Sequence, residues 1–271
     1  GVLSPSTILG YRKMQKKHYG KINDLRLSEV TSKNLQVYVS DLCSDHSAKS
    51  VRNVYGLLSA SLNQVSDKKY NVTLPTYVRP NLPTPNDEMV QKLLDSAKVP
   101  EMKIAMMISA FGTMRRGEIS AIKYKDIDRE KTAIYVHADI VQDENLKWVY
   151  KPYPKTEKSI RLIQYPKEVF DYIPEGDPDT FVVPFTPQSL TRRFRKLRDK
   201  IGAEGITLQS LRRYAASFMH ALGIPDKYIM ETGGWASDRV LKAVYENTLS
   251  DKQIEFTEKR NDYVAKKFFK K

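Results

Sequence analysis

Four prolines within residues 74–85, "LPTYVRPNLPTP", constrain the fold of this chain more than any other feature. Proline has no backbone N–H and disfavours helix at the residue before it, so this stretch is expected to be extended. The 271 residues also exceed what one typical core requires, because domains cluster near about 100 to 150 residues. The sequence therefore predicts a first domain at 1–73, a linker at 74–85 and a second domain from residue 86 onward.

The first domain is expected to be small and helical. Apolar residues recur at helical spacing in three stretches: 6–19, 31–42 and 47–68. The residues at the expected N-cap positions of these stretches are Ser6, Thr31 and Ser47. The apolar face of the third stretch consists of Val51, Val54, Leu58 and Leu62. Each predicted helix is therefore amphipathic, as a helix packed in a small bundle should be.

The residue pattern of the second domain changes twice, from helical to β-rich and back to helical. Helices are predicted at 84–98 and 101–113, and a third starts near Arg115. Three β-rich runs follow, separated by polar turns: 132–142, 147–154 and 159–166. From Pro187 onward the helical pattern returns and continues to the C-terminus. The predicted fold class is mainly α with one small antiparallel β-sheet of three strands.

The chain carries an excess of positive charge. It contains 45 Lys and Arg against 32 Asp and Glu, which gives a formal net charge of +13 and a pI near 9.5. Residues 1–80 alone hold 12 Lys or Arg and 5 Asp or Glu, so the excess is densest in the first domain. Basic proteins attract polyanions by releasing condensed counterions, and nucleic acid is the commonest such partner. A basic surface that serves only solubility is the alternative.

The composition excludes several classes of protein. No run of about 18 apolar residues is present to cross a membrane, and the first residues lack a signal-peptide pattern. Cys43 is the only cysteine, which excludes an intramolecular disulfide and a cysteine-based zinc site and favours a reducing cytoplasm. The four histidines are scattered, so we expect no metal site: His18, His46, His137 and His220.

Four polar motifs occupy places in the second domain where a purely structural core would not put them. They are "GTMRRGEIS" with Arg115, "PKTEKSIR" with Lys155, "LQSLRRYAASFM" with Arg212, and "GGWASDRVLKAVY" with Trp235 and Tyr245. Arg212 falls on the helix face of Leu208, which is expected to point inward, and an inward arginine needs an anionic partner such as Glu118. Taken singly, the motifs also fit a surface charge, a solvated turn lysine and an aromatic core residue.

The order of these motifs resembles that of the tyrosine recombinases, the phage integrase family. By this resemblance, residues 1–73 are similar to the family's helical core-binding domain and residues 86–249 to its catalytic domain. Residues 250–271 are expected to form a C-terminal tail helix, which would have more apolar side chains than an isolated surface helix should expose. The resemblance favours docking of this tail on a neighbouring protomer, and packing against its own domain is the alternative.

The resemblance implies a role for each motif. Arg115 and Arg212 match the two catalytic arginines, Lys155 the β-hairpin lysine, Trp235 the His-or-Trp position and Tyr245 the nucleophile. Gln209 departs from the pattern, since the family most often has histidine at that position. A glutamine amide donates a hydrogen bond to a phosphate oxygen but accepts no proton at neutral pH. Either donation is the role that matters there, or the base is water or another residue.

These residue types suit phosphoryl transfer. In-line displacement at a phosphodiester concentrates negative charge on the non-bridging oxygens, and guanidinium groups such as those of Arg115 and Arg212 grip these oxygens bidentately. Trp235 offers one indole N–H donor and a broad apolar flank. Lysine gives up a proton when neighbouring arginines lower its pKa, which suits Lys155 as the general acid for the departing 5′-hydroxyl.

The resemblance implies a site-specific DNA recombinase, such as the integrase of a phage or an integrative mobile element. Tyr245 attacks the phosphorus and forms a 3′-phosphotyrosyl intermediate. Four protomers on two double-stranded core sites exchange strands through a Holliday junction, with no metal or nucleotide cofactor. The setting is the bacterial cytoplasm and its nucleoid, and an accessory DNA-bending or excision protein is a further candidate partner.

Two other functions fit the same residues. A type IB topoisomerase shares the set of Arg, Lys, Arg and Tyr but relaxes supercoiled DNA as a monomer. A basic DNA-binding regulator without catalysis would use the arginines only to hold phosphate and would keep Tyr245 in its core. A protein–DNA adduct that survives SDS distinguishes the enzymes from the regulator.

Overall fold

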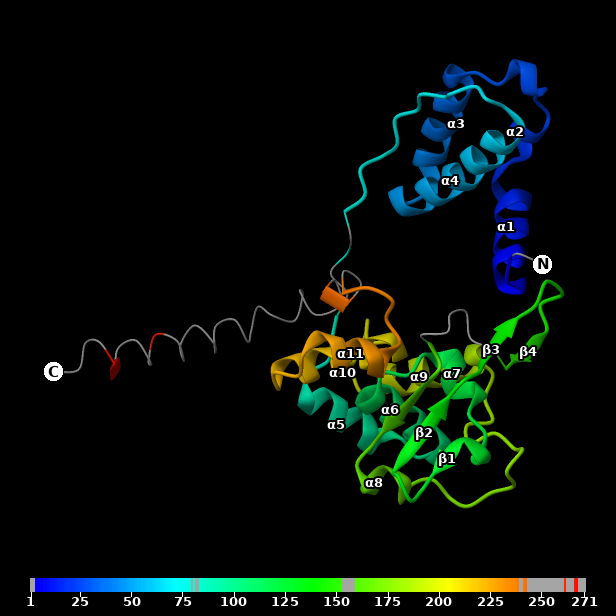
Figure 1. The fold of residues 1–271 in the computed structure, drawn as a ribbon. Helices are drawn as coiled ribbons and strands as arrows, with labels where there is room; N and C mark the ends of the chain where they lie inside the picture. The colour runs from blue at the N-terminus through cyan, green and yellow to red at the C-terminus, as the bar shows by residue number, and fades with distance from the viewer. Residues whose placement is uncertain are drawn as a thin grey trace. The chain divides into compact units, whose positions relative to one another are not determined.

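A computed structural model describes residues 3–78, 80, 83–152, 159–238, 241–242, 261 and 266–267 of the chain. Lys155, Tyr245 and nearly all of the 250–271 tail lie outside the described residues. The chain divides into two compact units: Gly1–Pro80 with Gln142–Lys147, and Asn81–Val141 with Trp148–Lys271 (Figure 1). Within the described ranges, no helix has the length and apolar character that a bilayer span requires.

The first unit consists of short helices around one apolar core. Its elements are α1 (Pro5–His18), α2 (Gly20–Asn23), the 3-10 helix η1 (Leu27–Glu29), α3 (Ser32–Asp45) and α4 (Ala48–Val65). The predicted inward face of α4 is buried, because Val51, Val54, Leu58 and Leu62 all lie in this core. Two tyrosine hydroxyls brace the helices by donating to backbone carbonyls, Tyr19 to Val54 (2.8 Å) and Tyr38 to His18 (3.0 Å).

Two of the three predicted N-caps are confirmed. The Thr31 and Ser47 side chains accept hydrogen bonds from the first turns of α3 and α4. The prediction for Ser6 is wrong, because α1 begins at Pro5 and Ser4 is its N-cap. Proline suits the first helical position, where its missing N–H costs nothing and its fixed φ matches the helix. The helix therefore starts at the proline rather than after it.

The chain that leaves α4 stays on the first unit before it enters the proline-rich stretch. Val72 and Leu74 pack against the first core, and Gln36 exchanges hydrogen bonds with the backbone of Thr73. The Arg52 guanidinium donates to the Pro75 carbonyl at 2.9 Å. The described part of 74–85 contains no helix or strand. An extended path is what a run of prolines favours.

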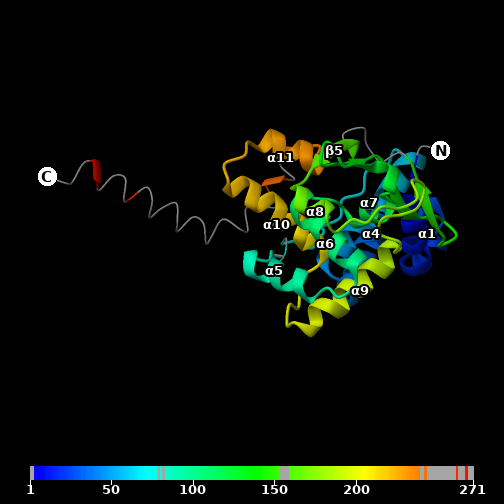
Figure 2. The ribbon, with the colours of Figure 1, turned by 90° about the horizontal axis from the view of Figure 1, so that it is seen from below.

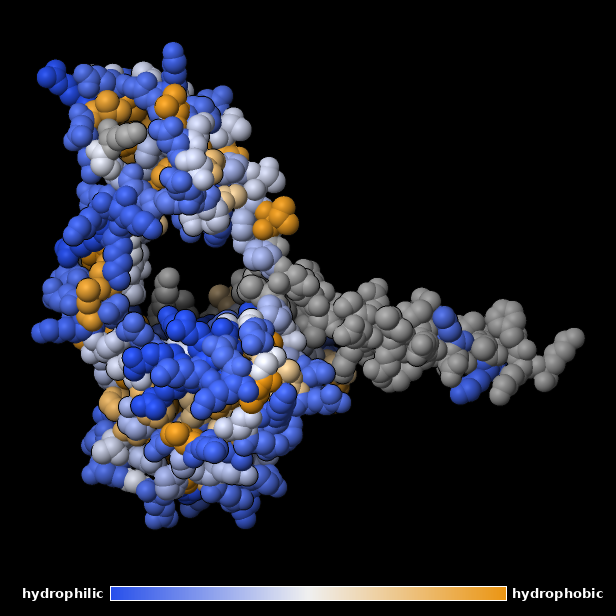
Figure 3. All heavy atoms as spheres, turned by 180° about the vertical axis from the view of Figure 1, so that it is seen from behind, coloured by the Kyte–Doolittle hydropathy of each residue, from blue (hydrophilic) through white to orange (hydrophobic). Residues whose placement is uncertain are grey.

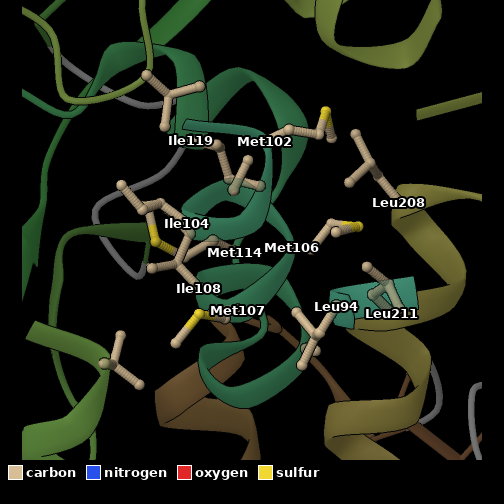
Figure 4. Close-up of a cluster of buried hydrophobic side chains, with 14 of the residues drawn as sticks. Leu94, Met102, Ile104, Met106, Met107, Ile108, Met114, Ile119, Leu208 and Leu211 are labelled. Atoms are coloured by element: carbon tan, nitrogen blue, oxygen red, sulfur yellow. The ribbon is translucent and has the colours of Figure 1, made fainter. Parts of the chain in front are cut away.

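The second unit is built around α6. Its helices are α5 (Asp87–Ser96), α6 (Pro100–Gly112), α7 (Arg116–Ala121), η2 (Tyr124–Asp126), α8 (Lys167–Phe170), α9 (Pro187–Lys200), α10 (Leu208–Ala221) and α11 (Asp226–Gly233). Most of α6 is buried, and the helix packs most extensively against α10. Figure 4 shows this contact, where Met106 faces Leu208 and Leu211. A helix that is apolar nearly all round belongs in the centre of a domain.

The strands form two separate ladders. They are β1 (Ile127–Asp128), β2 (Ala133–Val136), β3 (Asp139–Gln142), β4 (Trp148–Lys151) and β5 (Arg161–Gln164). β1, β2 and β5 form a three-stranded antiparallel sheet in which Ile134 lies opposite Ile163, and β3 pairs with β4 alone. β5 also contacts α11 (Figure 2).

The prediction of one sheet from the three β-rich runs is therefore wrong in its pairing. The run at 132–142 splits at His137, whose imidazole lies 2.9 Å from the Asp126 carboxylate. β5 alternates buried and exposed residues, β2 is buried except at Tyr135, and both strands pack on the core, whereas β3 and β4 are half-buried throughout. Strand pairing follows which face is buried, and the β3–β4 ladder lacks one fully buried face.

A third apolar cluster joins α10 to α11. Its buried members are Ala215, Ala216, Met219, Ile229, Trp235 and Leu241. The turn after α10 ends in Gly223, which has a φ of 79° that favours glycine. This cluster places Trp235 against the side of α10 that also bears Arg212.

Candidate active site

Three arginines converge on the C-terminal end of α11. Three successive carbonyl oxygens each accept a hydrogen bond from a different guanidinium: Thr232 from Arg161 (2.7 Å), Gly233 from Arg212 (2.7 Å) and Gly234 from Arg115 (3.0 Å). The last carbonyls of a helix have no partner within the helix and carry partial negative charge. Arg115 is the N-cap of α7, Arg161 begins β5 and Arg212 lies in α10, so the end of α11 joins these three elements.

The two glycines of "GGW" are required by the geometry at this end. Gly234 is the C-cap of α11 and has a φ of 60°, a left-handed conformation that favours glycine. A Cβ at Gly233 would overlap the Trp235 ring, so only glycine lets the indole lie against the helix end. The Trp235 ring in turn covers Arg212, whose Cζ lies 4.2 Å from the ring centroid, within the range of a cation–π contact.

Thr113 provides a second left-handed turn at the same place. It is the buried C-cap of α6 with a φ of 61°, a conformation that is uncommon for a β-branched residue. Its carbonyl accepts from Arg212, and its hydroxyl donates to the Thr232 carbonyl at 3.0 Å. These contacts hold the turn in place, and backbone strain of this kind is often found at functional sites.

Arg212 lies at the bottom of the cluster and is only 1% exposed. Its described hydrogen-bond partners are the carbonyls of Thr113 and Gly233, and the Trp235 ring covers it. The expectation that Glu118 would pair with this buried arginine is therefore wrong. Burial, followed by the charge of Arg115, lowers the pKa of the Arg212 guanidinium.

Glu118 instead binds two other arginines. Its carboxylate accepts from the Arg115 side chain at 2.6 Å and from the Arg115 backbone N–H at 2.8 Å. It also accepts from Arg161 at 2.8 and 3.3 Å. Burial alone would raise the pKa of Glu118, but Arg161 and Arg115 together hold it below its usual value. One ionised, 3% exposed carboxylate thus fixes two guanidiniums.

Arg161 is a member of the site to which the sequence analysis gave no role. It is the first residue of β5, and its side chain is 6% exposed. The signal lay in the alternation of "RLIQ", where Arg161 and Ile163 share the buried face of the strand. A charged residue at an inward position of a strand needs partners, and that rule would have indicated a site.

The remaining predicted residues are placed as follows. Gln209 is exposed on the first turn of α10, one turn before Arg212. Arg116 is exposed and donates to the Thr191 hydroxyl of α9 at 3.2 Å, away from the Glu118 carboxylate. The structure therefore brings Arg115, Arg212 and Trp235 together, while Lys155 and Tyr245 are outside the described residues. Over the described part of the chain, no three His, Cys, Asp or Glu side chains are grouped to hold a metal ion.

Asp139, the first residue of β3, lies against Gly117 in α7. A Cβ at Gly117 would overlap the Asp139 carboxyl, so glycine permits the close approach of the two elements. Burial and then the charge of Glu118 raise the pKa of Asp139 to about 6. The basic side chains that oppose this shift are Arg115, Lys151 and Arg116. The carboxyl consequently titrates at a pH where most aspartates are already ionised.

We expect Asp139→Asn to remove a pH dependence of stability. A folded pKa above the unfolded value gives a stabilising contribution that is complete below about pH 4 and is lost as the pH rises through about 6. The variant should therefore exceed the parent by about 1–3 kcal/mol in free energy of unfolding at pH 7, and match it near pH 4. Urea titrations from pH 4 to 7 measure this difference, and a constant difference across that range contradicts the assignment.

Comparison with known proteins identifies the family. Residues 86–251 match the family model described as "Phage integrase family". A curated relative, "Tyrosine recombinase XerC-like" of Caldanaerobacter subterraneus subsp. tengcongensis, is 23% identical over 307 aligned positions, and the alignment covers 95% of this chain and 78% of the relative. Both similarities include the stretches that carry Arg115, Arg212 and Trp235.

Solved structures share the fold. A Tn1549 transposon integrase in complex with transposon right end DNA superposes with a TM-score of 0.75 at 16% identity and covers 90% of each chain. A lambda integrase tetramer bound to a Holliday junction gives a TM-score of 0.64 at 16% identity and covers 90% of this chain and 73% of that one. Because the family match spans more than half of the sequence, the chain belongs to the phage integrase family and is a tyrosine recombinase enzyme.

Proposed function

We propose that the protein is a site-specific DNA recombinase that cleaves and rejoins strands through a 3′-phosphotyrosyl intermediate. The observation that carries this proposal is the cluster of Arg115, Arg161 and Arg212 at the end of α11, in which the Glu118 carboxylate binds Arg115 and Arg161. The three positive charges of the guanidiniums outnumber the one negative charge of Glu118, so the cluster favours binding of an added anion. A DNA phosphate is the anion that the family's substrate supplies.

Arg115 and Arg212 have different positions in this scheme. The Arg115 side chain is 36% exposed and is the first to meet a phosphate, whereas Arg212 lies beneath it. Both stabilise the negative charge that grows on the non-bridging oxygens as the phosphorus is attacked. Trp235 contributes its indole N–H and keeps Arg212 covered. Because the carbonyls of α11 already orient the guanidiniums, little reorganisation is needed during the reaction.

The covalent steps require two further residues. The Tyr245 phenolate oxygen bonds to phosphorus while the bond to the 5′-oxygen breaks, and Lys155 gives the departing oxygen its proton. The phenolic proton leaves to water or to another base, because the Gln209 amide cannot accept it. A new 5′-hydroxyl then attacks the phosphotyrosine, returns a proton to Lys155 and releases Tyr245. The bond energy is conserved, so the scheme uses no ATP.

Binding of double-stranded DNA rests on charge spread over the chain. Figure 3 shows hydrophilic side chains over much of the larger unit's visible face. The helix α9 has exposed basic residues along its length: Arg192, Arg193, Arg195, Lys196 and Lys200. Such side chains bind phosphates without reading sequence.

We assign residues 1–73 to a core-binding domain, 74–85 to a linker and 86–249 to the catalytic domain, which together hold a core site in the cytoplasm.

Assembly is proposed to involve four protomers on two core sites. The lambda integrase relatives include a dimer on a COC′ core site and a tetramer on a Holliday junction, which supports this stoichiometry. The transposon and phage integrases among the structural relatives support integration and excision of a mobile element, with an accessory DNA-bending or excision protein as a further partner.

A comparison of two DNA assays tests the proposed function. A recombinase exchanges strands between paired copies of its core site and leaves plasmids without the site supercoiled. A type IB topoisomerase, the alternative that shares the same residues, relaxes supercoiled DNA regardless of such sites. Relaxation without exchange would therefore contradict the proposal, and neither activity would favour a DNA-binding regulator.

The tail at 250–271 is proposed to dock on a neighbouring protomer. Deletion of residues 251–271 should leave binding to a single half-site unchanged but weaken cooperative binding to the full site, because the tail's apolar side chains would lose their groove. Native gels with half-site and full-site DNA measure both effects. Unchanged multimeric complexes would assign the tail to its own domain.

A further inference from the structure

We infer that Arg161 is a positioning residue that holds the Lys155 segment in register with Arg115 and the end of α11. The inference rests on the proposed function for the role of Lys155, but the contacts that carry it belong to the described residues. It assigns a task to an arginine that neither the sequence motifs nor the chemistry of strand cleavage used. Arg161 is not itself placed against the phosphate.

Arg161 is well placed along the chain for this task. Only Ser159 and Ile160 separate it from residue 158, the last of the 153–158 segment that contains Lys155. Arg161 begins β5, and β5 pairs with β2 over four residues, so the strand is fixed to the core sheet. The contacts of Arg161 therefore fix the start of β5 and, through the Ser159 carbonyl, the two described residues before it.

The Arg161 guanidinium contacts three parts of the structure at once. Its Nη1 and Nη2 donate to the Glu118 carboxylate of α7, and its Nε donates to the Thr232 carbonyl of α11 at 2.7 Å. Nη1 also donates to the Ser159 carbonyl at 2.9 Å, so the same side chain holds the backbone just before β5. The rigid fork of arginine allows this, whereas a lysine ammonium is a single point charge on a flexible stem.

The partners of Arg161 are shared with the arginine cluster. Glu118 also binds Arg115, and the Thr232 carbonyl also accepts from the Thr113 hydroxyl. Loss of Arg161 would leave Arg115 with Glu118 and Gly234 as partners, but would remove the described side-chain ties from β5 to α7 and α11. The main consequence should therefore fall on the Lys155 side of the site.

Stability alone gives little reason for this buried ion pair. Desolvation of two charges often offsets their attraction, and well-packed apolar residues can replace such pairs without loss. The hydrogen bonds of Arg161 to Glu118, Thr232 and Ser159 specify the direction and register of β5 more strictly than apolar packing does.

Two variants and one matched control test the inference in the full chain. Arg161→Gln removes the charge and the fork, and Arg161→Lys keeps a charge for Glu118 so that folding is maintained. Arg129→Gln is the control, since Arg129 also caps backbone carbonyls, those of Phe170, Ile173 and Pro174, at 2.6 to 3.3 Å but makes no contact with Glu118. Thermal unfolding establishes that each variant is folded.

The assay compares two nicked DNA substrates that differ in the leaving group. One has the ordinary 5′-oxygen, which needs a proton, and the other has a 5′-bridging sulfur, which leaves as a thiolate without one. We expect Arg161→Gln and Arg161→Lys to slow cleavage of ordinary DNA by about 10²-fold or more, as loss of general acid catalysis does, with DNA affinity unchanged. The sulfur substrate should restore most of the rate, as it should for Lys155→Ala but not for Arg115→Ala.

Two results would overturn the inference. One is a cleavage rate for both Arg161 variants equal to that of Arg129→Gln, and the other is an equal loss on the oxygen and sulfur substrates. Amide hydrogen exchange in the free protein gives a second readout, in which both Arg161 variants should exchange faster at 161–164 and 232–235 than the control. Protection equal to that of the parent contradicts the inference. A parent that forms no covalent adduct would instead contradict the proposed function.

Discussion

Tyr245→Phe is expected to abolish strand cleavage and to leave DNA affinity close to that of the parent. The substitution removes only the phenolic oxygen, which is the attacking atom in the proposed step. Binding depends on many phosphate contacts over both domains, so the loss of one hydroxyl changes it little. A nicked substrate that traps the cleaved state measures the adduct on denaturing gels, and a titration of labelled DNA measures affinity.

Another tyrosine serves as the control for this prediction. Tyr172 is 47% exposed and follows α8, so Tyr172→Phe removes a phenolic hydroxyl without disturbing the core. It should cleave as the parent does. Equal cleavage by Tyr245→Phe and the parent would show that a different residue is the nucleophile.

Arg212→Ala is expected to lower the cleavage rate by about 10³-fold and also to destabilise the fold. Removing one preorganised donor to a developing oxyanion costs rates of this order. The substitution also leaves the carbonyls of Thr113 and Gly233 without their donor and opens a cavity under Trp235. We expect a loss of about 3–5 kcal/mol in free energy of unfolding, because a buried hydrogen-bonded charge is removed and its partners remain.

The neighbouring Arg213 separates the two effects. Arg213 donates to the Pro83 carbonyl and to the Ser210 hydroxyl, at 2.9 and 2.8 Å, whereas Arg212 donates to Thr113 and Gly233. Arg213→Ala should keep nearly the parent's cleavage rate. Arg212→Lys should recover part of the stability but little of the rate, since lysine lacks the fork that reaches two carbonyls. Equal rates for Arg212→Ala and Arg213→Ala would contradict the assignment.

Local patterns predicted much of the fold. The period of Val51, Val54, Leu58 and Leu62 specified the inward face of α4, and Thr31 and Ser47 were recognisable as caps by their chemistry. Errors arose where a tertiary contact decided the outcome. The break at His137 depends on the Asp126 carboxylate, and the pairing of β2 with β5 depends on which strands the core covers. Neither contact is visible in a pattern of alternating residues.

The candidate site, like the fold, was predictable where motifs decided it and not where tertiary contacts did. The order of motifs pointed to Arg115, Arg212 and Trp235, and the structure brings these three residues together at the end of α11. The partners of the arginines were not predictable, because successive backbone carbonyls take the place that a carboxylate was expected to fill. Glu118 reaches Arg115 within one helical turn, but its contact with Arg161 joins residues 43 positions apart. Such a contact exists only once the sheet and α7 are assembled.

The most direct test of the central claim is to identify the bond between protein and DNA. End-labelled core-site DNA is incubated with the parent in EDTA, the adduct is isolated in SDS, and proteolysis followed by mass spectrometry locates the modified residue. We predict a single adduct on Tyr245, linked to the 3′-phosphate of the cleaved strand, with a free 5′-hydroxyl that a polynucleotide kinase can label. An adduct on another residue, linkage to a 5′-phosphate, or cleavage that occurs only with added magnesium would contradict the account.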